Sequence, residues 1–263
     1  MVGGGRMGEA LVAGLLDAKW CRPDELAVVE KVEPRRKELG DRFPGVQFAA
    51  EPVEAEAAVI AVKPPDVAEA CSVVTASGAS RALSIAAGIT IARLEAWLGG
   101  AIAVVRAMPN TPALVGAGAA AIAPGTRAEE DDLAWAENLL RAVGIVVRVP
   151  ERLLDAVTGL SGSGPAYVYL VAEALIDAGV AVGLPRPAST ALATQTILGA
   201  GRLLVESGDT PEVLRAAVTT PGGTTAAGLG ALEARAMRAA FAEAVAAATA
   251  RARELGDSGT PTQ

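Results

Sequence analysis

The residues best suited to hold a small anion lie in the last third of the chain, where Thr219 opens the run Thr-Thr-Pro-Gly-Gly-Thr-Thr. Two adjacent glycines, Gly222 and Gly223, let the backbone turn tightly, so that successive N–H groups converge on one point. Thr224 and Thr225 add hydroxyls where an alanine-rich helix is predicted to begin, and a helix start favours an anion. The run therefore fits a small carboxylate with a hydroxyl beside it. An ordinary turn capped by glycine and threonine is the alternative.

A second glycine-rich turn lies near the other end of the chain, where residues 3–8 fit the pattern G-x-G-x-x-G. In a dinucleotide-binding unit the first glycine makes the turn, the second admits the pyrophosphate, and the third lets the next helix pack closely. Glu30 follows the next predicted strand, about where an acid binds the ribose of such a cofactor. Only two residues precede Gly3, fewer than a central strand needs. We therefore expect the natural chain to start a few residues upstream.

The composition excludes several classes of function. The 263 residues carry a net charge of −7 without a basic, aromatic-rich cluster, so we expect no nucleic-acid partner. The chain contains no histidine, which excludes a Ser-His-Asp hydrolase and a histidine-ligated metal site. Cys21 and Cys71 lack metal-ligand spacing, and we recognise neither a secretory leader nor a membrane span. These features predict a cytoplasmic protein without a metal site or a membrane partner.

The predicted elements divide the chain into two domains. Over residues 1–150 apolar strands alternate with short helices, which predicts a mostly parallel sheet covered on both faces. Strands are predicted over residues 26–30, 46–48, 57–62, 82–86, 102–106, 117–123 and 145–149. Helices are predicted over residues 7–18, 34–40, 91–98 (capped by Thr90) and 126–142, the last opened by a capping box at Thr126 and Glu129.

Strand patterns end at residue 151. Helices are predicted over residues 165–182, 188–207, 211–218 and 224–255, and a solvated tail over 258–263. The stretch 167–182 is apolar nearly all round, because its only charges are Glu173 and Asp177. A helix without a polar face belongs inside a larger assembly. We therefore predict an all-helical domain over residues 151–257 that intertwines with a second copy of itself.

Seven segments, in this order, resemble the pyrroline-5-carboxylate reductase family, and together they cover essentially the whole chain. They are the glycine-rich start and residues 61–64, 86–88, 106–112, 159–167, 183–185 and 211–233. The resemblance implies an α/β N-terminal Rossmann-like dinucleotide-binding domain followed by an all-α C-terminal dimerisation domain. It implies hydride transfer from NADPH or NADH to C5 of 1-pyrroline-5-carboxylate, which forms L-proline in the last step of its biosynthesis. The implied assembly is a homodimer or a larger ring of dimers.

The resemblance also assigns roles to residues around the substrate. Gly222, Gly223 and Thr224 would hold the substrate carboxylate through backbone N–H groups. Thr225 would hydrogen-bond the ring nitrogen as the candidate catalytic residue. A protonated imine is already a strong electrophile, so the protein has mainly to position the two reactants. The lack of histidine is then no obstacle.

On the cofactor side, the implied residues fall into three groups. The pyrophosphate would meet Gly3, Gly5, Arg6, Met7 and Gly8, the nicotinamide half would be lined by Ala61, Val62, Lys63 and Pro64, and its floor would be Ala86, Ala87 and Gly88. Lys63 is alternatively a solvated lysine at a strand end. Asn110 either orients the carboxamide or holds a turn. Ser161 and Ser163 are favoured as caps, with the edge of an active site as the second interpretation.

Two positions depart from the family pattern. Glu30 stands where many members carry a small or basic residue, and a carboxylate there prefers a ribose 2′-OH to a 2′-phosphate. Lys31, Arg35 and Arg36 follow at once and could compensate, so the choice between NADH and NADPH stays open, with a lean to NADH. Residues 49–56 lack the asparagine often found near the adenosine.

Two other classes of protein fit the sequence less well. The β-hydroxyacid dehydrogenases share the layout but use a lysine on a long helix, and residues 151–263 contain no lysine. A dinucleotide-sensing scaffold that had lost catalysis would not need the run Thr-Thr-Pro-Gly-Gly-Thr-Thr at residues 219–225, here called the threonine-glycine corner. This corner is intact. The sequence leaves open the oligomer size beyond the dimer and the acceptance of related cyclic imines.

Overall fold

The computed structural model describes residues 1–257, so the predicted tail 258–263 lies outside the described residues. The chain divides into two compact units, Met1–Ser163 with Val245–Gln263, and Gly164–Ala244. The predicted boundary at residue 150 comes earlier than this division, because the residues just after it pack on the first unit. Leu154, for example, is fully buried against Ile91, Ala121 and Ala123.

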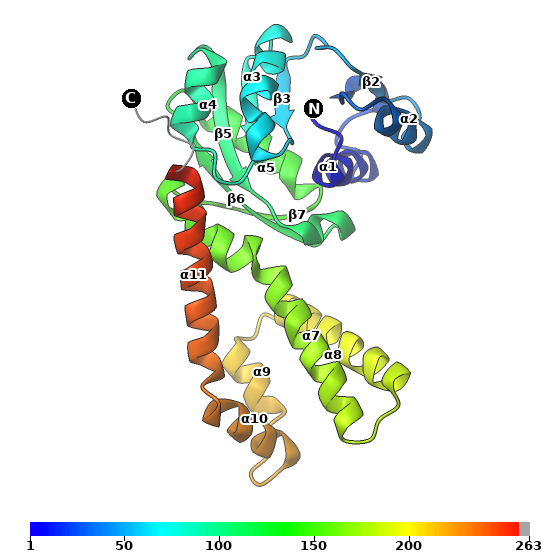
Figure 1. Ribbon diagram of the computed structural model, residues 1–263, viewed down its shortest axis with the longest axis vertical. Coiled ribbons are helices and arrows are strands. Elements are labelled where there is room, and N and C mark those ends of the chain that lie inside the picture. The colour runs from blue at the N-terminus through cyan, green and yellow to red at the C-terminus, as the bar shows by residue number, and fades with distance from the viewer. Residues whose placement is uncertain (258–263) are drawn as a thin grey trace. The chain divides into compact units, whose positions relative to one another are not determined.

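The first unit is built on a sheet whose strands follow the order β2-β1 and β3-β4-β5-β6-β7 (Figure 1). Their bounds are β1 Ala27–Val29, β2 Gln47–Ala49, β3 Ala57–Ile60, β4 Arg81–Ser84, β5 Ala103–Met108, β6 Gly118–Pro124 and β7 Gly144–Arg148. Every predicted strand is present. Paired strands in the described residues run parallel except β5 and β6, which are antiparallel.

The first three residues join the two groups of strands. Val2 forms parallel bridges to Val29 of β1 and to Ile60 of β3. Its N–H donates to the carbonyl of Val59 at 2.7 Å, and its carbonyl accepts from Ala61 N–H at 2.8 Å. The short start of the chain therefore occupies the central strand position, and the glycine-rich turn follows at its carboxyl end.

Several helices cover the sheet, besides the short α6 Leu154–Val157 that carries Leu154. They are α1 Arg6–Asp17, α2 Glu33–Arg42, α3 Val67–Ala76, α4 Ile91–Leu98 and α5 Glu130–Arg141. Helix α3 is absent from the predicted elements. The predicted capping box of α5 is wrong, because Glu129 and Asp132 form that box. Thr126 instead donates from its N–H and its hydroxyl to Glu95, at 2.6 and 2.9 Å.

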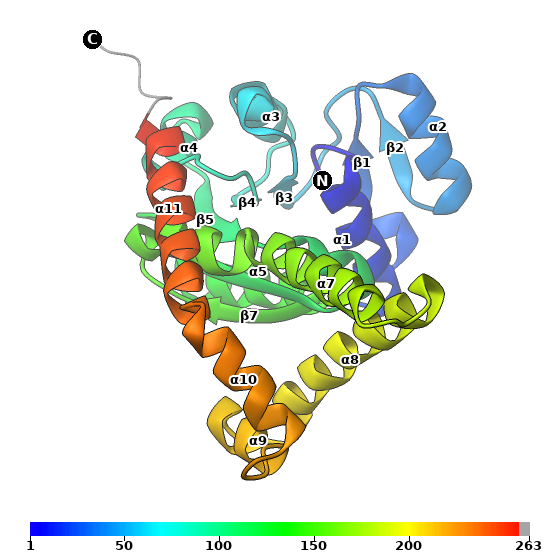
Figure 2. The same cartoon turned by 60° about the horizontal axis from the view of Figure 1, so that its bottom comes forward.

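Alternate strand residues face opposite helical layers, as the period of two in a strand requires. Ala58, Ile60 and Val104 are buried with residues of α3 and α4. Val59, Leu83 and Val105 are buried with residues of α1 and α5. Figure 2 shows α3 and α4 on one side of these strands. The expectation of a sheet covered on both faces is confirmed, and this rigid core holds the carboxyl ends of the strands in place.

An ion pair fastens the segment after β7 to the sheet. Arg106 of β5, with only 8% of its side chain exposed, donates to Glu151 at 2.9 Å. The same carboxylate oxygen accepts from Ile91 N–H at 2.7 Å, at the start of α4. One carboxylate thus connects a strand, a helix start and the beginning of the segment that leads to the second unit.

We expect Arg106→Met to lower the free energy of unfolding by about 2 kcal/mol, because Glu151 would keep a partly buried charge without its partner. Urea denaturation of the two proteins measures the difference. Arg22→Met is the matched control, because Arg22 pairs with Asp24 where both side chains are 70% exposed, and such surface pairs contribute little. An equal loss in both variants would contradict a structural role for the Arg106 pair.

The second unit is helical throughout. It contains α7 Gly164–Ala181, α8 Arg186–Glu206, α9 Pro211–Ala217, α10 Thr224–Ala234 and the first part of α11 Met237–Asp257. The predicted single helix over residues 224–255 is wrong, because Ala236 takes a left-handed φ of 55° and separates α10 from α11. A salt bridge of 2.8 Å between Glu233 and Arg238 spans this break.

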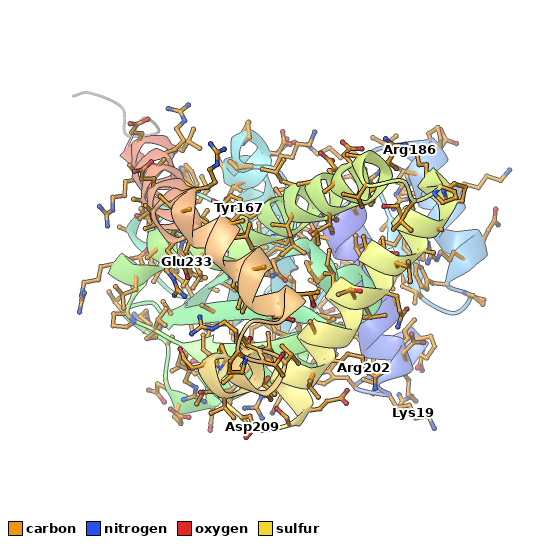
Figure 3. All side chains as sticks on the ribbon, turned by 90° about the horizontal axis from the view of Figure 1, so that it is seen from below. Lys19, Tyr167, Arg186, Arg202, Asp209 and Glu233 are labelled. Atoms are coloured by element: carbon orange, nitrogen blue, oxygen red, sulfur yellow. The ribbon has the colours of Figure 1, made fainter. Side chains whose placement is uncertain are left out.

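Helices α7 and α8 pack against each other and leave many apolar side chains exposed. Ser189 of α8 donates to the Ile176 carbonyl of α7 at 2.7 Å, which ties the pair together. Figure 3 shows Arg186 and Arg202 among the charged side chains of α8. Leu170, however, is 65% exposed and Val205 83% exposed. Large apolar surfaces of this kind mark sites of association.

One helical stretch in the described residues, Glu151–Ala181, has the length and apolar composition that a membrane-crossing helix needs. This test uses length and composition only. If the predicted intertwined dimer forms, a second copy would cover the same apolar side chains.

Candidate functional site

A long cleft lies at the carboxyl ends of the parallel strands, where open α/β sheets bind their ligands. It consists of two adjoining cavities of about 360 Å³ and about 420 Å³. Both cavities share walls formed by Gly5, Ala61, Val62 and Lys63. A dinucleotide has two halves joined by a pyrophosphate, so two cavities that meet at a glycine-rich turn fit its outline.

The glycine turn lies between Val2, which pairs with the neighbouring strands, and helix α1. At two of its glycines there is no room for a side chain. Gly3 has a φ of 104°, and a Cβ there would lie 2.6 Å from the Ala61 carbonyl oxygen. A Cβ on Gly8 would lie 2.2 Å from the Gly3 carbonyl oxygen. At Gly5 an added Cβ would meet no atom within 4 Å. Gly5 therefore faces open space in the cleft, whereas Gly3 and Gly8 hold the turn and the helix together.

Helix α1 starts at this turn with its amide groups toward the cleft wall. Gly5 is the N-cap and provides no side chain to cover the first N–H groups. Arg6 and Met7, in the first turn of α1, line the smaller cavity. Uncovered amides and the positive end of a helix attract a phosphate group. The chain thus provides a cradle that fits a pyrophosphate.

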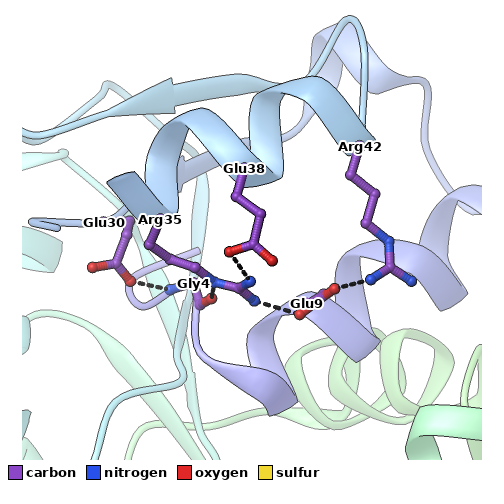
Figure 4. A network of polar contacts seen from close by, with 6 residues as sticks. All are labelled: Gly4, Glu9, Glu30, Arg35, Glu38 and Arg42. Carbon is purple, nitrogen blue, oxygen red and sulfur yellow. Dashed lines mark hydrogen bonds and ion pairs between the residues drawn. The ribbon is translucent and has the colours of Figure 1, made fainter. Parts of the chain in front are cut away.

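Glu30 is held at the end of β1 by two backbone amides. One carboxylate oxygen accepts from Gly4 N–H at 2.9 Å, and the other accepts from Val32 N–H at 2.9 Å. Figure 4 shows the first of these contacts beside the glycine turn. Glu30 lines the larger cavity. Its position agrees with that of the ribose-binding acid in dinucleotide-binding units.

A network of ion pairs lies behind Glu30, between α1 and α2 (Figure 4). Glu9 of α1 pairs with Arg35 and Arg42 of α2. Arg35 also pairs with Glu38 at 2.8 Å and donates from Nε to the Gly4 carbonyl at 2.9 Å. The hydrogen bonds to Glu38 and then to Glu9 raise the pKa of Arg35. Gly4 is thereby held from both sides, by Glu30 at its N–H and by Arg35 at its carbonyl.

Asn110 connects the loop after β5 to a π-helical turn, Thr158–Gly162. Its amide nitrogen donates to the Ser161 carbonyl at 3.1 Å, and its amide oxygen accepts from Ala119 N–H at 2.8 Å. Asn110 and Gly162 both line the smaller cavity. Because both ends of the amide have protein partners, these contacts favour the structural alternative for Asn110. Turns of the π type occur often at functional sites.

The cleft brings together most of the predicted cofactor residues. Those that line it are Gly3, Gly5, Arg6, Met7, Glu30, Ala61, Val62, Lys63, Ala87 and Asn110. Gly8, Pro64, Ala86 and Gly88 lie outside its lining. Gly8 packs on Gly3, and buried Ala86 donates its N–H to Ser84 at 3.4 Å. Pro64 begins a short 3-10 turn.

Several lining residues had no site role assigned from the sequence, although four of them lie in segments that carry the family resemblance. They are Ile85, Met108, Pro109, Thr111 and Gly162 in the smaller cavity, and Val32, Ala50, Asp66, Ala70 and Val73 in the larger one. Most are apolar or small, and their types give no chemical signal. Their common feature is position, because many follow the carboxyl end of a strand. A systematic search of strand ends would have found Ile85, Pro109 and Thr111.

The threonine-glycine corner lies in the second unit, at the start of α10. Gly222 has a φ of 71°, and Gly223 N–H donates to the Thr220 carbonyl at 3.0 Å. A proline followed by a glycine with positive φ is typical of a tight type II turn. Gly223 is the N-cap of α10 and provides no covering side chain. The first amides of α10, at Thr224 and Thr225, are therefore available to an anion.

The two thiols are poor nucleophiles at neutral pH. Burial raises the pKa of Cys71 to about 11. Burial, and next the charge of Glu25, raises the pKa of Cys21. Because the thiolate is the reactive form, these shifts lower the reactivity of both thiols at neutral pH.

Comparison with protein families gives two matches. Residues 151–255 match the model described as pyrroline-5-carboxylate reductase dimerisation. Residues 1–88 match the model described as NADP oxidoreductase coenzyme F420-dependent. These ranges contain the threonine-glycine corner and the glycine-rich turn respectively.

Similar proteins and structures match over nearly the full length. A pyrroline-5-carboxylate reductase of Synechocystis sp. is 46% identical over 264 residues, which cover 97% of each chain. One of Thermus thermophilus is 44% identical over 260 residues, covering 98% of each chain. The structure of the Coxiella burnetii reductase aligns with a TM-score of 0.91 at 35% identity, covering 97% of this chain and 96% of that one. A Plasmodium falciparum pyrroline carboxylate reductase with NADP bound aligns with a TM-score of 0.83 at 30% identity, with the same coverage.

Proposed function

The chain belongs to the pyrroline-5-carboxylate reductase family, and on this premise we propose how its own residues carry out the reaction. It is an NAD(P)H-dependent oxidoreductase that reduces the C=N bond of 1-pyrroline-5-carboxylate and forms L-proline, the last step of proline biosynthesis. The bound cofactor supplies a hydride to C5 of the substrate. The residues of the chain bind and orient the two reactants.

The cleft in the first unit is the proposed cofactor site, and the observation that supports this best is the form of the glycine turn. Gly5 leaves open space where two cavities meet, and the first amides of α1 are uncovered there. The pyrophosphate would bind at this point, with Arg6 and Lys63 as nearby cations. The nicotinamide would enter the smaller cavity, beside Ala87 and Met108, and the adenosine would enter the larger one, beside Glu30.

The threonine-glycine corner is the proposed substrate site. Backbone amides of Gly222 and Thr224 would bind the carboxylate, helped by the positive end of α10. The third predicted donor, Gly223 N–H, already donates to the Thr220 carbonyl at 3.0 Å, so Gly223 would act by shaping the turn. The Thr225 hydroxyl would hydrogen-bond the ring nitrogen and hold its proton in place. Since the imine is most reactive when protonated, a hydroxyl that keeps the proton on nitrogen increases the electrophilic character of C5.

The test is the loss of nicotinamide absorbance when pyrroline-5-carboxylate is added to the purified protein with NADH or with NADPH. We expect a substrate-dependent rate with at least one cofactor, and proline as the product. Stable cofactor absorbance with both, in a protein that remains folded, would contradict the proposed use of these residues.

The family match shows a dimerisation domain, and the chain forms a homodimer. We further propose that the dimer, alone or in a ring of dimers, acts in the cytoplasm without a nucleic-acid or membrane partner. The net charge of −7 disfavours nucleic acid. The exposed apolar side chains of α7 and α8, such as Leu170 and Val205, suit a second copy of the chain. Light scattering after size exclusion measures the assembly, and a monomer at micromolar concentration would contradict it.

A further inference from the structure

We infer that Glu30 makes this reductase selective for NADH over NADPH, an inference that rests on the proposed cofactor site. The sequence leaves this choice open because three cations follow Glu30 directly. The structure shows where each of those cations is engaged, and this settles which charge the ribose would meet.

The Glu30 carboxylate is fixed in the larger cavity. Its two oxygens accept from Gly4 N–H and Val32 N–H, each at 2.9 Å. The Gly4 amide belongs to the glycine turn, and the Val32 amide belongs to the segment between β1 and α2. The carboxylate cannot turn away from the cavity without breaking both hydrogen bonds. A carboxylate oxygen has more than one lone pair, so each can still accept from a ribose hydroxyl. A 2′-phosphate at the same place would meet a fixed negative charge.

The two arginines that follow Glu30 do not line either cavity of the described cleft. Arg35 uses all three guanidinium nitrogens, for Gly4 O, Glu9 and Glu38. Arg36 donates to the carbonyls of Glu30 and Lys31, each at 2.7 Å. Both side chains therefore bind the backbone near Glu30, and among the described residues neither forms an ion pair with its carboxylate.

Lys31 lines the larger cavity, but it pairs with Glu69 of α3. Asp66 adds a second carboxylate to the same lining. The remaining cation, Lys63, is shared with the smaller cavity and lies where the pyrophosphate is proposed. The larger cavity is thus lined by two carboxylates, Glu30 and Asp66, and two lysines. Because Lys31 is paired with Glu69 and Lys63 adjoins the proposed pyrophosphate position, the Glu30 carboxylate would present its negative charge to the ribose. The Plasmodium falciparum relative is described with NADP bound, so the inferred preference would distinguish this chain from that relative.

The experiment compares NAD⁺ with NADP⁺ binding by calorimetry on the full-length dimer, and kcat/KM for NADH with that for NADPH. Wild-type protein should favour the non-phosphorylated cofactor by about tenfold or more in both measurements, the effect of one or two charge-assisted hydrogen bonds. Glu30→Gln should lower this ratio by about ten- to a hundredfold. Glu33→Gln removes the same charge from an exposed residue outside the cleft lining, and should leave the ratio unchanged.

Tighter binding of NADP⁺ than NAD⁺ by the wild-type protein would overturn the selectivity inference and leave the proposed cofactor site standing. An equal ratio in wild type and a folded Glu30→Gln variant would overturn the role of Glu30. Binding of neither nucleotide would overturn the proposed cofactor site and the inference together. The wild-type comparison needs no variant, so it decides the matter even if Glu30→Gln fails to fold.

Discussion

Replacement of Thr225 by alanine is expected to lower kcat/KM for pyrroline-5-carboxylate by about ten- to a thousandfold, the effect of losing one polar contact to the transition state. The hydroxyl would hold the proton on the ring nitrogen as the hydride reaches C5. The loss should appear mainly in kcat, because the backbone amides that bind the carboxylate remain. Steady-state kinetics at saturating cofactor measure it.

Thr225→Ser is the matched control, because serine keeps the hydroxyl and removes only a methyl group. It should retain most of the activity. The turn itself is fixed by the positive φ of Gly222 and the Gly223–Thr220 hydrogen bond, so both variants should fold. Wild-type kinetics in Thr225→Ala would remove the hydroxyl from the mechanism.

The second large effect is expected at Gly5. An alanine there is compatible with the backbone, because φ is −68° and an added Cβ would meet no atom within 4 Å. That open space is the proposed path of the pyrophosphate. Gly5→Ala should therefore keep the melting temperature and weaken binding of NAD⁺ or NADP⁺ by about ten- to a hundredfold, the cost of one misplaced methyl group. Calorimetry combined with thermal melting separates the two quantities.

Gly8→Ala should behave in the opposite way. Its Cβ would lie 2.2 Å from the Gly3 carbonyl oxygen, so the helix would have to move away from the turn. We expect a lower melting temperature and a free energy of unfolding reduced by about 1–3 kcal/mol. If Gly5→Ala were to bind cofactor normally, the pyrophosphate would not approach the turn at this residue.

The strands of the first unit could be predicted because a strand buried on both faces appears in the sequence as a short, continuous apolar run. The apolar run 57–62 ends at Lys63, the apolar run 102–105 ends at Arg106, and strands β3 and β5 form on these two runs. Helix α3 was missed although its buried residues, Val67, Ala70, Cys71 and Val74, follow the i, i+3, i+4, i+7 spacing of an amphipathic helix. The signal is weak because the residues are mostly small and Glu69 is the only charge in residues 67–76.

Other errors have similar causes. Thr126 has the right spacing for a capping box with Glu129, but Glu95 from a distant helix binds it instead. Ala236 has high helix propensity, yet it lies at the break between α10 and α11 with a φ of 55°. In both cases a partner or a turn outside the local window decides the structure.

The glycine turn and the acid after β1 were visible in the sequence because their chemistry depends on residue type. The hydrogen-bond and ion-pair partners of Arg35 and Arg36 could not be predicted from the sequence. Sequence order places both near Glu30, but Arg35 binds Gly4 and Glu9, which lie 31 and 26 residues away in the chain. Arg36 binds the backbone carbonyls of Glu30 and Lys31 instead of a carboxylate. Whether a nearby cation offsets a carboxylate depends on contacts of this kind.

The half-exposed leucines and valines of α7 and α8 have a consequence for how the protein reaches its native state. Val182, directly after α7, and Val205 of α8 are each 83% exposed in one chain, so a newly made chain gains much of its stability only when it meets another. Unfolding should then depend on protein concentration, with a midpoint that rises as the solution is made more concentrated. Folding would end in a second-order step, and dilution would favour aggregation or capture by chaperones over native protein.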